Sequence, residues 1–199
     1  MPEERTKDKI LKTAIRMFSD SGYDKVSMRD IAAAVGVKAP SIYNHFASKE
    51  ELLKSIYAFY AEQQRQLFPD IENVLRLAET TSLPELLSMV DIRYSPPELD
   101  ETMNRIVAIA FREINTDRDS ELFIRQSIFD NVNGLLKPLF ERMIDLGKLE
   151  GFDVDVFLCL FNYFTLASVA LYTSPLKIGV ENWGACMQLL FQMILPKET

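Results

Sequence analysis

The chain has 199 residues, of which 48% are hydrophobic, which is enough for one or two modest cores. Its net charge of -7 argues against a surface that binds nucleic acid over its whole extent, because phosphates favour cationic partners. Its two cysteines, Cys159 and Cys186, lie too far apart in sequence for a metal cluster or a disulfide framework, so we expect reduced thiols and no metal or other cofactor.

The N-terminal segment contains patterns for two helices and a turn. Apolar side chains at helical spacing favour a helix over residues 6–21, and Gly22 follows as its terminator. Ser27, with an acidic residue three positions later, has the pattern of a helix N-cap. Gly36 ends this second helix, since glycine readily takes the left-handed conformation of a sharp turn.

A short third helix follows the glycine turn. Pro40 suits its first turn, where the missing N–H of proline costs no hydrogen bond. Ile42 and Phe46 lie four residues apart and give the helix its buried side, so the polar residues around them face outward. Two helices joined by a glycine turn in this way form a helix-turn-helix.

A long helix begins at Ser48, which forms a capping-box pattern with Glu51. The rest of the chain contains helical patterns and neither a strand pattern nor an internal repeat. We expect helices over residues 70–79, 83–94, 99–114, 120–146 (kinked at Pro138), 153–172 and 181–195. The predicted fold class is all-α, with a three-helix N-terminal domain joined by the long helix to a C-terminal helical bundle.

Residues 156–176 carry no charge and are apolar nearly all round. A stretch of this length raises the question of a membrane span, but polar residues interrupt it, Pro175 truncates it and cationic flanks are lacking. A helix that is apolar on every side must bury every side. We therefore expect the last two helices to pair with those of a second copy in an intermolecular four-helix bundle. No membrane contact is expected, and the absence of a secretion signal predicts a cytoplasmic protein.

The helix-turn-helix residues match a known signature at fixed spacing, over Ile31-Ala32, Ala34 to Val37, Ile42 to Phe46 and Ser48 to Leu52. This string resembles the DNA-binding motif of the tetracycline-repressor (TetR/AcrR) family of transcriptional regulators. The resemblance covers residues 5–55 by motif, and the remainder only by length and helical character. Lys38 departs from it, because the family often has a Ser or Thr cap there. The resemblance implies a homodimer that binds a palindromic operator in double-stranded DNA and a small-molecule effector.

Candidate DNA contacts gather around this motif. A helix N-terminus offers free amides and partial positive charge to a phosphate, and Ser27, Ser48 and Lys49 stand at two such termini. By resemblance Tyr43 and Lys49 contact phosphates, although Tyr43 has the alternative role of a core aromatic residue with a solvated hydroxyl. The outward residues of the short helix reach base edges or the adjacent backbone. The predicted DNA-binding residues are Ser27, Lys38, Ala39, Ser41, Tyr43, Asn44, His45, Ser48 and Lys49.

The charge is distributed in agreement with these contacts. Residues 1–50 carry nine basic and seven acidic side chains, a net charge of +2, whereas the rest of the chain has a net charge of -9. A DNA-facing N-terminal segment on an acidic body has this asymmetry, although +2 over fifty residues is commonplace.

The C-terminal body is rich in aromatic residues and methionines, which in a helical bundle are usually core. The resemblance implies a small-molecule pocket here, and the apolar composition favours a hydrophobic or amphipathic ligand. The candidate ligand-binding residues are Met89, Arg93, Tyr94, Met103, Phe111, Gln126, Phe161 and Phe164.

Catalytic activity is not expected. His45 is the only histidine and lies inside the helix-turn-helix, so a Ser-His or Cys-His arrangement would have to use it. The seven glycines form neither a GxGxxG motif nor a P-loop.

The sequence therefore predicts a helix-turn-helix DNA-binding domain at residues 1–50 and a ligand-binding and dimerisation domain at residues 51–199. The predicted function is that of a homodimeric transcriptional regulator, a repressor released from its operator by a small apolar or amphipathic ligand. Two alternatives stay open. One is a small-molecule-sequestering helical protein with a non-functional helix-turn-helix, and the other is a membrane-associated sensor anchored by residues 156–176.

Overall fold

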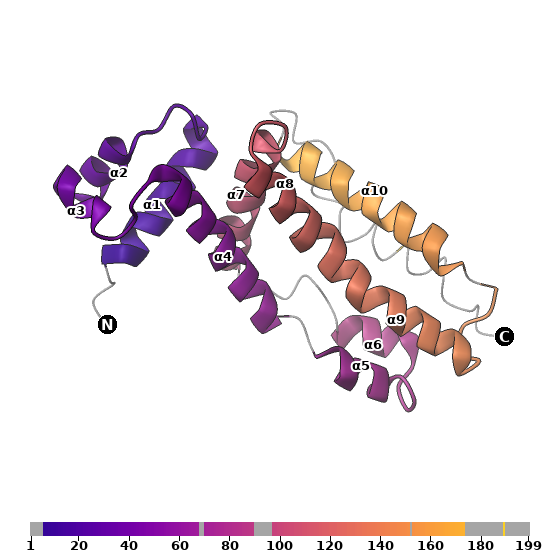
Figure 1. The fold of residues 1–199 in the computed structure, drawn as a ribbon. Coiled ribbons are helices and arrows are strands. Elements are labelled where there is room, and N and C mark those ends of the chain that lie inside the picture. Colours follow the sequence, from indigo (N-terminus) through magenta and orange to yellow (C-terminus); the bar gives the residue numbers. More distant parts are fainter. Residues whose placement is uncertain (1–5, 68–69, 90–96, 152, 174–188, 190–199) are drawn as a thin grey trace. The chain divides into compact units, whose positions relative to one another are not determined.

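The described part of the structure is built from helices alone (Figure 1). In this computed structural model the described residues are 6–67, 70–89, 97–151, 153–173 and 189. The predicted last helix, over residues 181–195, therefore lies outside them except for Leu189. None of the described helices is long and apolar enough to cross a membrane.

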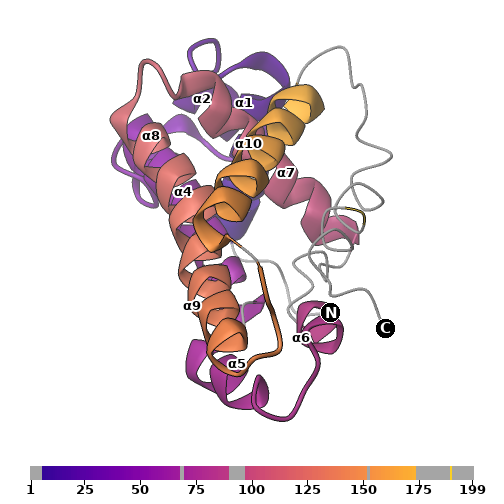
Figure 2. The ribbon, with the colours of Figure 1, turned by 90° about the vertical axis from the view of Figure 1, so that its right-hand side faces the viewer.

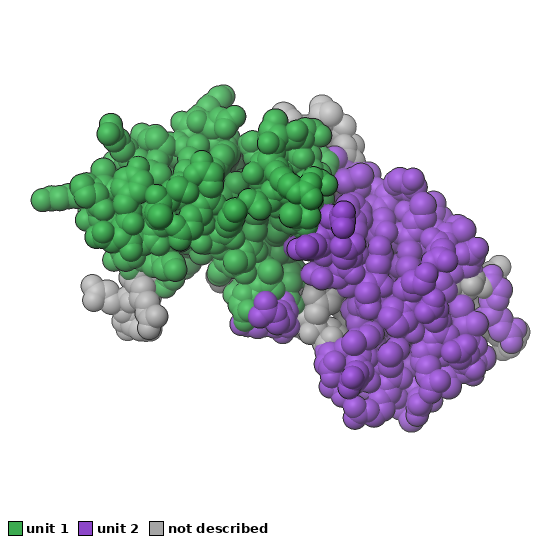
Figure 3. All heavy atoms as spheres, in the orientation of Figure 1, with its two compact units in different colours: residues 1–64, 95–124 green, residues 65–94, 125–199 purple. Residues whose placement is uncertain are grey.

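The chain divides into two compact units (Figure 3). Unit 1 comprises residues 1–64 and 95–124, and unit 2 comprises residues 65–94 and 125–199. This division follows packing, whereas the predicted boundary after residue 50 separates two functions and stays a prediction.

Unit 1 contains the predicted helix-turn-helix. Its helices are α1 (Thr6–Ser21), α2 (Met28–Val35), α3 (Ala39–Tyr43), most of α4 (Lys49–Leu67), α7 (Pro97–Glu113) and α8 (Arg118–Ile124). The bounds of α1 are those predicted, and Gly22 after it has a positive φ of 94°. Its first three helices and the start of α4 share a core of fully buried side chains: Ile10, Ala14, Phe18, Ile31, Ile42, Phe46, Leu52 and Ile56.

The ends of α2 are fixed as the sequence predicts. The Ser27 hydroxyl accepts a hydrogen bond from the Asp30 backbone N–H at 3.2 Å, and the Asp30 carboxylate accepts one from the Ser27 N–H at 2.8 Å. Together these two bonds form a capping box. At the other end Gly36 has φ 80° and ψ 27°, and the Val37 N–H reaches back to the Ala32 carbonyl at 2.9 Å.

The starts of α3 and α4 differ from ideal caps. Lys38 occupies the N-cap position of α3 and makes no side-chain capping bond, so Pro40 in the first turn is the feature that favours the helix start. At α4 the Ser48 hydroxyl accepts a hydrogen bond from the Glu51 N–H at 3.1 Å. The Glu51 carboxylate accepts its bond from the Ala47 N–H at 2.6 Å, one residue earlier than a capping box requires.

Hydrogen bonds and an ion pair link helix α7 to the C-terminal end of α1 within unit 1. Arg105 donates to the Ser19 hydroxyl at 2.7 Å and forms an ion pair with Asp20, and Arg112 donates to the Ser19 carbonyl. A cation is favourable at this end of a helix because the last carbonyls carry partial negative charge.

Unit 2 is built around α9, which contacts both α5 and α10 (Figure 2). Its described elements are α5 (Ile71–Leu77), α6 (Leu83–Met89), the π-helical segment η1 (Arg125–Asp130), α9 (Asn131–Asp145) and α10 (Val154–Thr173). The apolar faces of α5, α6, α9 and α10 enclose a hydrophobic cluster that includes Leu86, Leu136, Leu139, Phe140, Phe157 and Phe161.

The prediction of one helix over residues 120–146 is wrong in one respect. The segment consists of α8, the π-helical turn η1 and α9, so the α-helical hydrogen-bond pattern is interrupted at Arg125–Asp130. Pro138 lies inside α9, which continues past it. A π-helical turn holds one more residue than an α-helical turn, and apolar periodicity read in steps of three and four does not reveal it.

Candidate nucleic-acid interface

The segment from Lys38 to Phe46 divides into a buried and an outer face. Ile42 and Phe46 are 0% and 1% exposed and anchor the segment in the core of unit 1. Lys38, Tyr43 and Asn44 are exposed, and the remaining predicted contacts of the segment are partly exposed: Ala39, Ser41 and His45. The Tyr43 side chain is 49% exposed, so the alternative role as a core aromatic residue is wrong.

The other predicted contacts flank this segment in sequence and stand at the starts of α2 and α4. Ser27 is exposed, and its hydroxyl also donates to the Asp30 carboxylate at 2.6 Å. These hydrogen bonds from Ser27 hold the pKa of Asp30 below its usual value. Ser27 therefore has a capping role in the structure, and its contact with DNA stays a prediction.

Lys49 is partly buried at the start of α4 and lies against aromatic rings. Its ammonium nitrogen is 4.0 Å from the centre of the Tyr23 ring and 5.8 Å from that of Phe18, distances at which a cation is attracted to the ring face. Burial raises the pKa of Tyr23 to about 12, so its hydroxyl stays neutral. Sequence reasoning missed Tyr23, because it lies 26 positions before Lys49 and no local pattern links the two.

A second lysine shows the same arrangement. The ammonium of Lys7, on the exposed side of α1, lies 5.3 Å from the centre of the Phe46 ring. The segment that carries Tyr43 and Asn44 is thus bordered by cations from two helices, Lys7 from α1 and Lys49 from α4. Such a distribution favours contact with a phosphate backbone.

The predicted ligand-binding residues do not form one described group. Met103 is buried and Phe111 partly buried on α7 in unit 1. In unit 2, Phe161 is buried, Phe164 packs partly buried against the same apolar cluster, and Gln126 is exposed on η1. The side chains of Met89, Arg93 and Tyr94 lie outside those that the structure describes. The ligand site stays a prediction.

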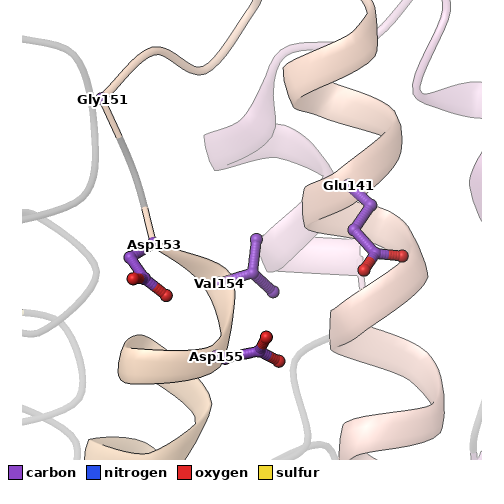
Figure 4. A pocket seen from close by; sticks show the side chains of 5 residues that line it. All are labelled: Glu141, Gly151, Asp153, Val154 and Asp155. Carbon is purple, nitrogen blue, oxygen red and sulfur yellow. The ribbon is translucent and has the colours of Figure 1, made fainter.

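A surface pocket of about 580 Å³ opens in unit 2 (Figure 4). It is lined by Glu141 of α9 and by Gly151, Asp153, Val154 and Asp155 at and before the start of α10. Lys137 partly neutralises it, since its ammonium is 2.6 Å from the Asp155 carboxylate and 4.0 Å from that of Glu141. The described lining is acidic and contains none of the predicted ligand-binding residues that the structure describes, so this lining does not suit an apolar ligand.

The helices that carry the candidate interface match a known family. The sequence pattern of the bacterial regulatory proteins of the tetR family matches residues 10–56, from α1 into α4. Residues 10–56 therefore match the N-terminal domain of the tetR family. This match confirms the predicted resemblance to a family of regulatory proteins rather than to an enzyme family.

A curated relative supports the same conclusion for the N-terminal part. The chain is 34% identical over 76 residues to the negative transcriptional regulator IcaR of the biofilm operon icaADBC from Staphylococcus aureus. That similarity covers 38% of this chain and 37% of the relative.

Solved structures extend the likeness to the whole fold. The TetR-family regulator PfmR from Thermus thermophilus has a TM-score of 0.64, covers 92% of this chain with 97% of its own, and is 20% identical. SmeT, solved as a complex with triclosan, has a TM-score of 0.68, covers 98% of this chain with 93% of its own, and is 18% identical. The predicted all-α TetR architecture is thereby confirmed.

Proposed function

We propose that this TetR-family protein is a homodimeric transcriptional repressor that binds a palindromic operator and is released from it by a small apolar or amphipathic ligand. The observation that carries the proposal is the exposed polar face of residues 38–45, anchored by buried Ile42 and Phe46 and flanked by the N-termini of α2 and α4. A short helix with this division suits a major groove, and helix N-termini on either side suit the adjacent phosphates.

The comparisons support the sign of regulation and the ligand. IcaR is a negative transcriptional regulator, and SmeT has been solved with triclosan, which supports a repressor that responds to a small molecule. Such a regulator acts in the cytoplasm, beside the chromosome.

Dimerisation gives the operator its symmetry. Two helix-turn-helix units related by a two-fold axis bind half-sites in successive major grooves, roughly one turn of the DNA helix (~34 Å) apart. A ligand releases the dimer only if it binds better to a conformation with the wrong spacing, and such coupling is typically about 1 to 3 kcal/mol. A compound that binds tightly but leaves operator affinity unchanged is therefore not the inducer.

Selection of bound fragments from sheared DNA of the source organism tests the proposal. The selection is run at two salt concentrations, because non-specific binding falls steeply with salt. We expect enrichment of one palindromic site that survives the higher salt. The selection is repeated in the presence of metabolites from a cell extract. If the folded, dimeric protein enriches no site under either condition, the repressor proposal is replaced by the alternative of a small-molecule-sequestering protein with a non-functional helix-turn-helix.

Lys49→Ala tests the predicted phosphate contact. We expect weaker binding to specific and random DNA alike, and a salt dependence shallower by about one unit, because one fewer counterion is released. Lys54→Ala is the matched control, since Lys54 lies on the same helix and its charge is compensated by Asp119 at 3.3 Å. Equal slopes for wild type and Lys49→Ala would show that Lys49 is not a phosphate contact.

A further inference from the structure

The Tyr23 ring occupies a fixed position beside Lys49. It packs edge-on against Phe18, with 5.1 Å between the ring centres, and Phe18 is fully buried in the core of unit 1. Tyr23 follows α1 directly after Gly22, whose positive φ of 94° turns the chain there. The ring that faces the ammonium at 4.0 Å is therefore held by the core and not by the lysine itself.

The ammonium of Lys49 keeps its hydrogen-bonding capacity in this position. An ammonium has three N–H donors, and a ring face satisfies the cation on one side only. Within the described residues, neither a carboxylate nor a carbonyl oxygen accepts a hydrogen bond from Lys49. At least two donors thus stay available to an acceptor from outside the protein.

Carboxylates close to Lys49 attract its ammonium and so compete with the Tyr23 ring for it. Burial raises the pKa of Glu113, and the charge of Lys49 opposes this shift, so the two groups lie within electrostatic reach. Glu50 follows Lys49 directly and also interacts with its charge. Without the ring, a flexible lysine side chain would sample positions beside these acids and lose its single orientation.

We propose that Tyr23 is a positioning residue for DNA binding, whose ring holds the Lys49 ammonium at the start of α4 with its donors free for a backbone phosphate. The inference rests on the proposed function, because it takes Lys49 as a phosphate contact. Pre-orienting the side chain lowers the entropy that is lost when it binds. The phosphate then replaces solvent on the open side of the ammonium, while the ring stays on the other.

An NMR measurement without DNA tests the contact itself. Protons above a ring face are shifted upfield, so we expect the Lys49 ε-methylene protons of the folded 199-residue chain to be upfield of those of exposed Lys54. The shift should persist in Tyr23→Phe, which keeps the ring, and should decrease in Tyr23→Leu. An ordinary Lys49 shift in the wild-type protein overturns the proposal without any variant.

A double-mutant cycle on a random-sequence DNA duplex tests the consequence. A cation–π contact of this kind contributes about 0.5 to 1 kcal/mol, so we expect Tyr23→Leu to weaken binding roughly two- to fivefold and to reduce the salt slope. Tyr23→Phe should bind like wild type. In the Lys49→Ala background, Tyr23→Leu should cause no further loss, whereas a merely structural role of Tyr23 would weaken binding equally in both backgrounds.

The outcomes separate the two proposals. If Lys49→Ala leaves affinity and salt slope unchanged while the upfield shift is present, the phosphate contact fails and this inference fails with it. If Lys49→Ala reduces the slope but Tyr23→Leu does not, the proposed function stands and only the role of Tyr23 is overturned. Thermal unfolding of each variant establishes that it is folded at the temperature of the binding assay.

Discussion

Single polar side chains fix helix ends in both units. In unit 1 the Ser27–Asp30 pair satisfies the first amides of α2. In unit 2 Lys148 binds at the C-terminal end of α5. Its ammonium donates to the carbonyls of Ala78, Glu79 and Thr81 at 2.7, 2.9 and 3.2 Å. Carbonyls at and after the last turn of α5 have no partner within the helix, and this one cation satisfies three of them.

Replacing Lys148 should therefore lower the stability of the protein. We expect Lys148→Met to reduce the free energy of unfolding by about 1 to 2 kcal/mol, since it leaves partly buried carbonyls without their charged donor. Lys137→Met is the control, because Lys137 pairs with the exposed carboxylate of Asp155 at the surface and such pairs contribute little. Chemical denaturation of both variants checks this, and equal losses would contradict it.

Between elements, the contacts of α7 with α1 assign α7 to the same compact unit as the helix-turn-helix. Arg105 links the two helices through Ser19 and Asp20, and Asp20 raises the pKa of the Arg105 guanidinium. Tyr57 of α4 similarly bonds to buried Ser120 of α8 at 2.7 Å, and its ring stacks on Phe123 at 4.5 Å. Helices of the C-terminal sequence thus support the DNA-binding helices directly.

The arginine link is testable by hydrogen exchange. We expect Arg105→Met to reduce the amide protection of the last turn of α1, because that turn loses one of the two cations, Arg105 and Arg112, that join it to α7. Arg118→Met should leave the protection unchanged, since Arg118 is 80% exposed and its contact with Glu121 is 3.7 Å long. Unchanged protection in Arg105→Met would show that Arg105 is not needed and that Arg112 and apolar packing suffice to dock α7.

At the scale of the whole molecule, α10 has an exposed apolar face among the residues that the structure describes. Val156, Leu160 and Tyr163 are 55%, 54% and 67% exposed and recur at helical spacing. A contiguous apolar face of this kind marks an interaction site, and the proposed dimer would bury it against a second copy.

Charges on this face should separate the proposed dimer. We expect the double variant Leu160→Glu, Tyr163→Glu to sediment as a monomer, because a two-fold interface brings each introduced charge close to its copy. Affinity for a palindromic operator should fall much more than affinity for random DNA, since the two half-sites are no longer bound together. Arg76→Glu, at an exposed position of α5, is the control for the charge change. A dimer that persists in the double variant would place the interface elsewhere.

Local sequence patterns determined the helix-turn-helix. The capping box at Ser27, the left-handed turn at Gly36 and the buried pair Ile42 and Phe46 each involve residues at most four positions apart. Interactions this short depend on helical geometry alone, so the sequence predicted α1, α2, α3 and the start of α4 correctly, and with them the family resemblance of these helices.

The tertiary structure decided what long-range packing controls. The ring of Tyr23 contacts Lys49, 26 positions later in the sequence, and Arg105 contacts Asp20, 85 positions earlier. No periodicity in the sequence encodes such pairs. The π-helical turn at Arg125–Asp130 is likewise not visible in the sequence, because its residues have the same apolar spacing as an ordinary helix. The sequence by itself thus determined the fold class and the DNA-binding motif, whereas only the folded chain decided which side chains support that motif and which apolar side chains of α10 are exposed.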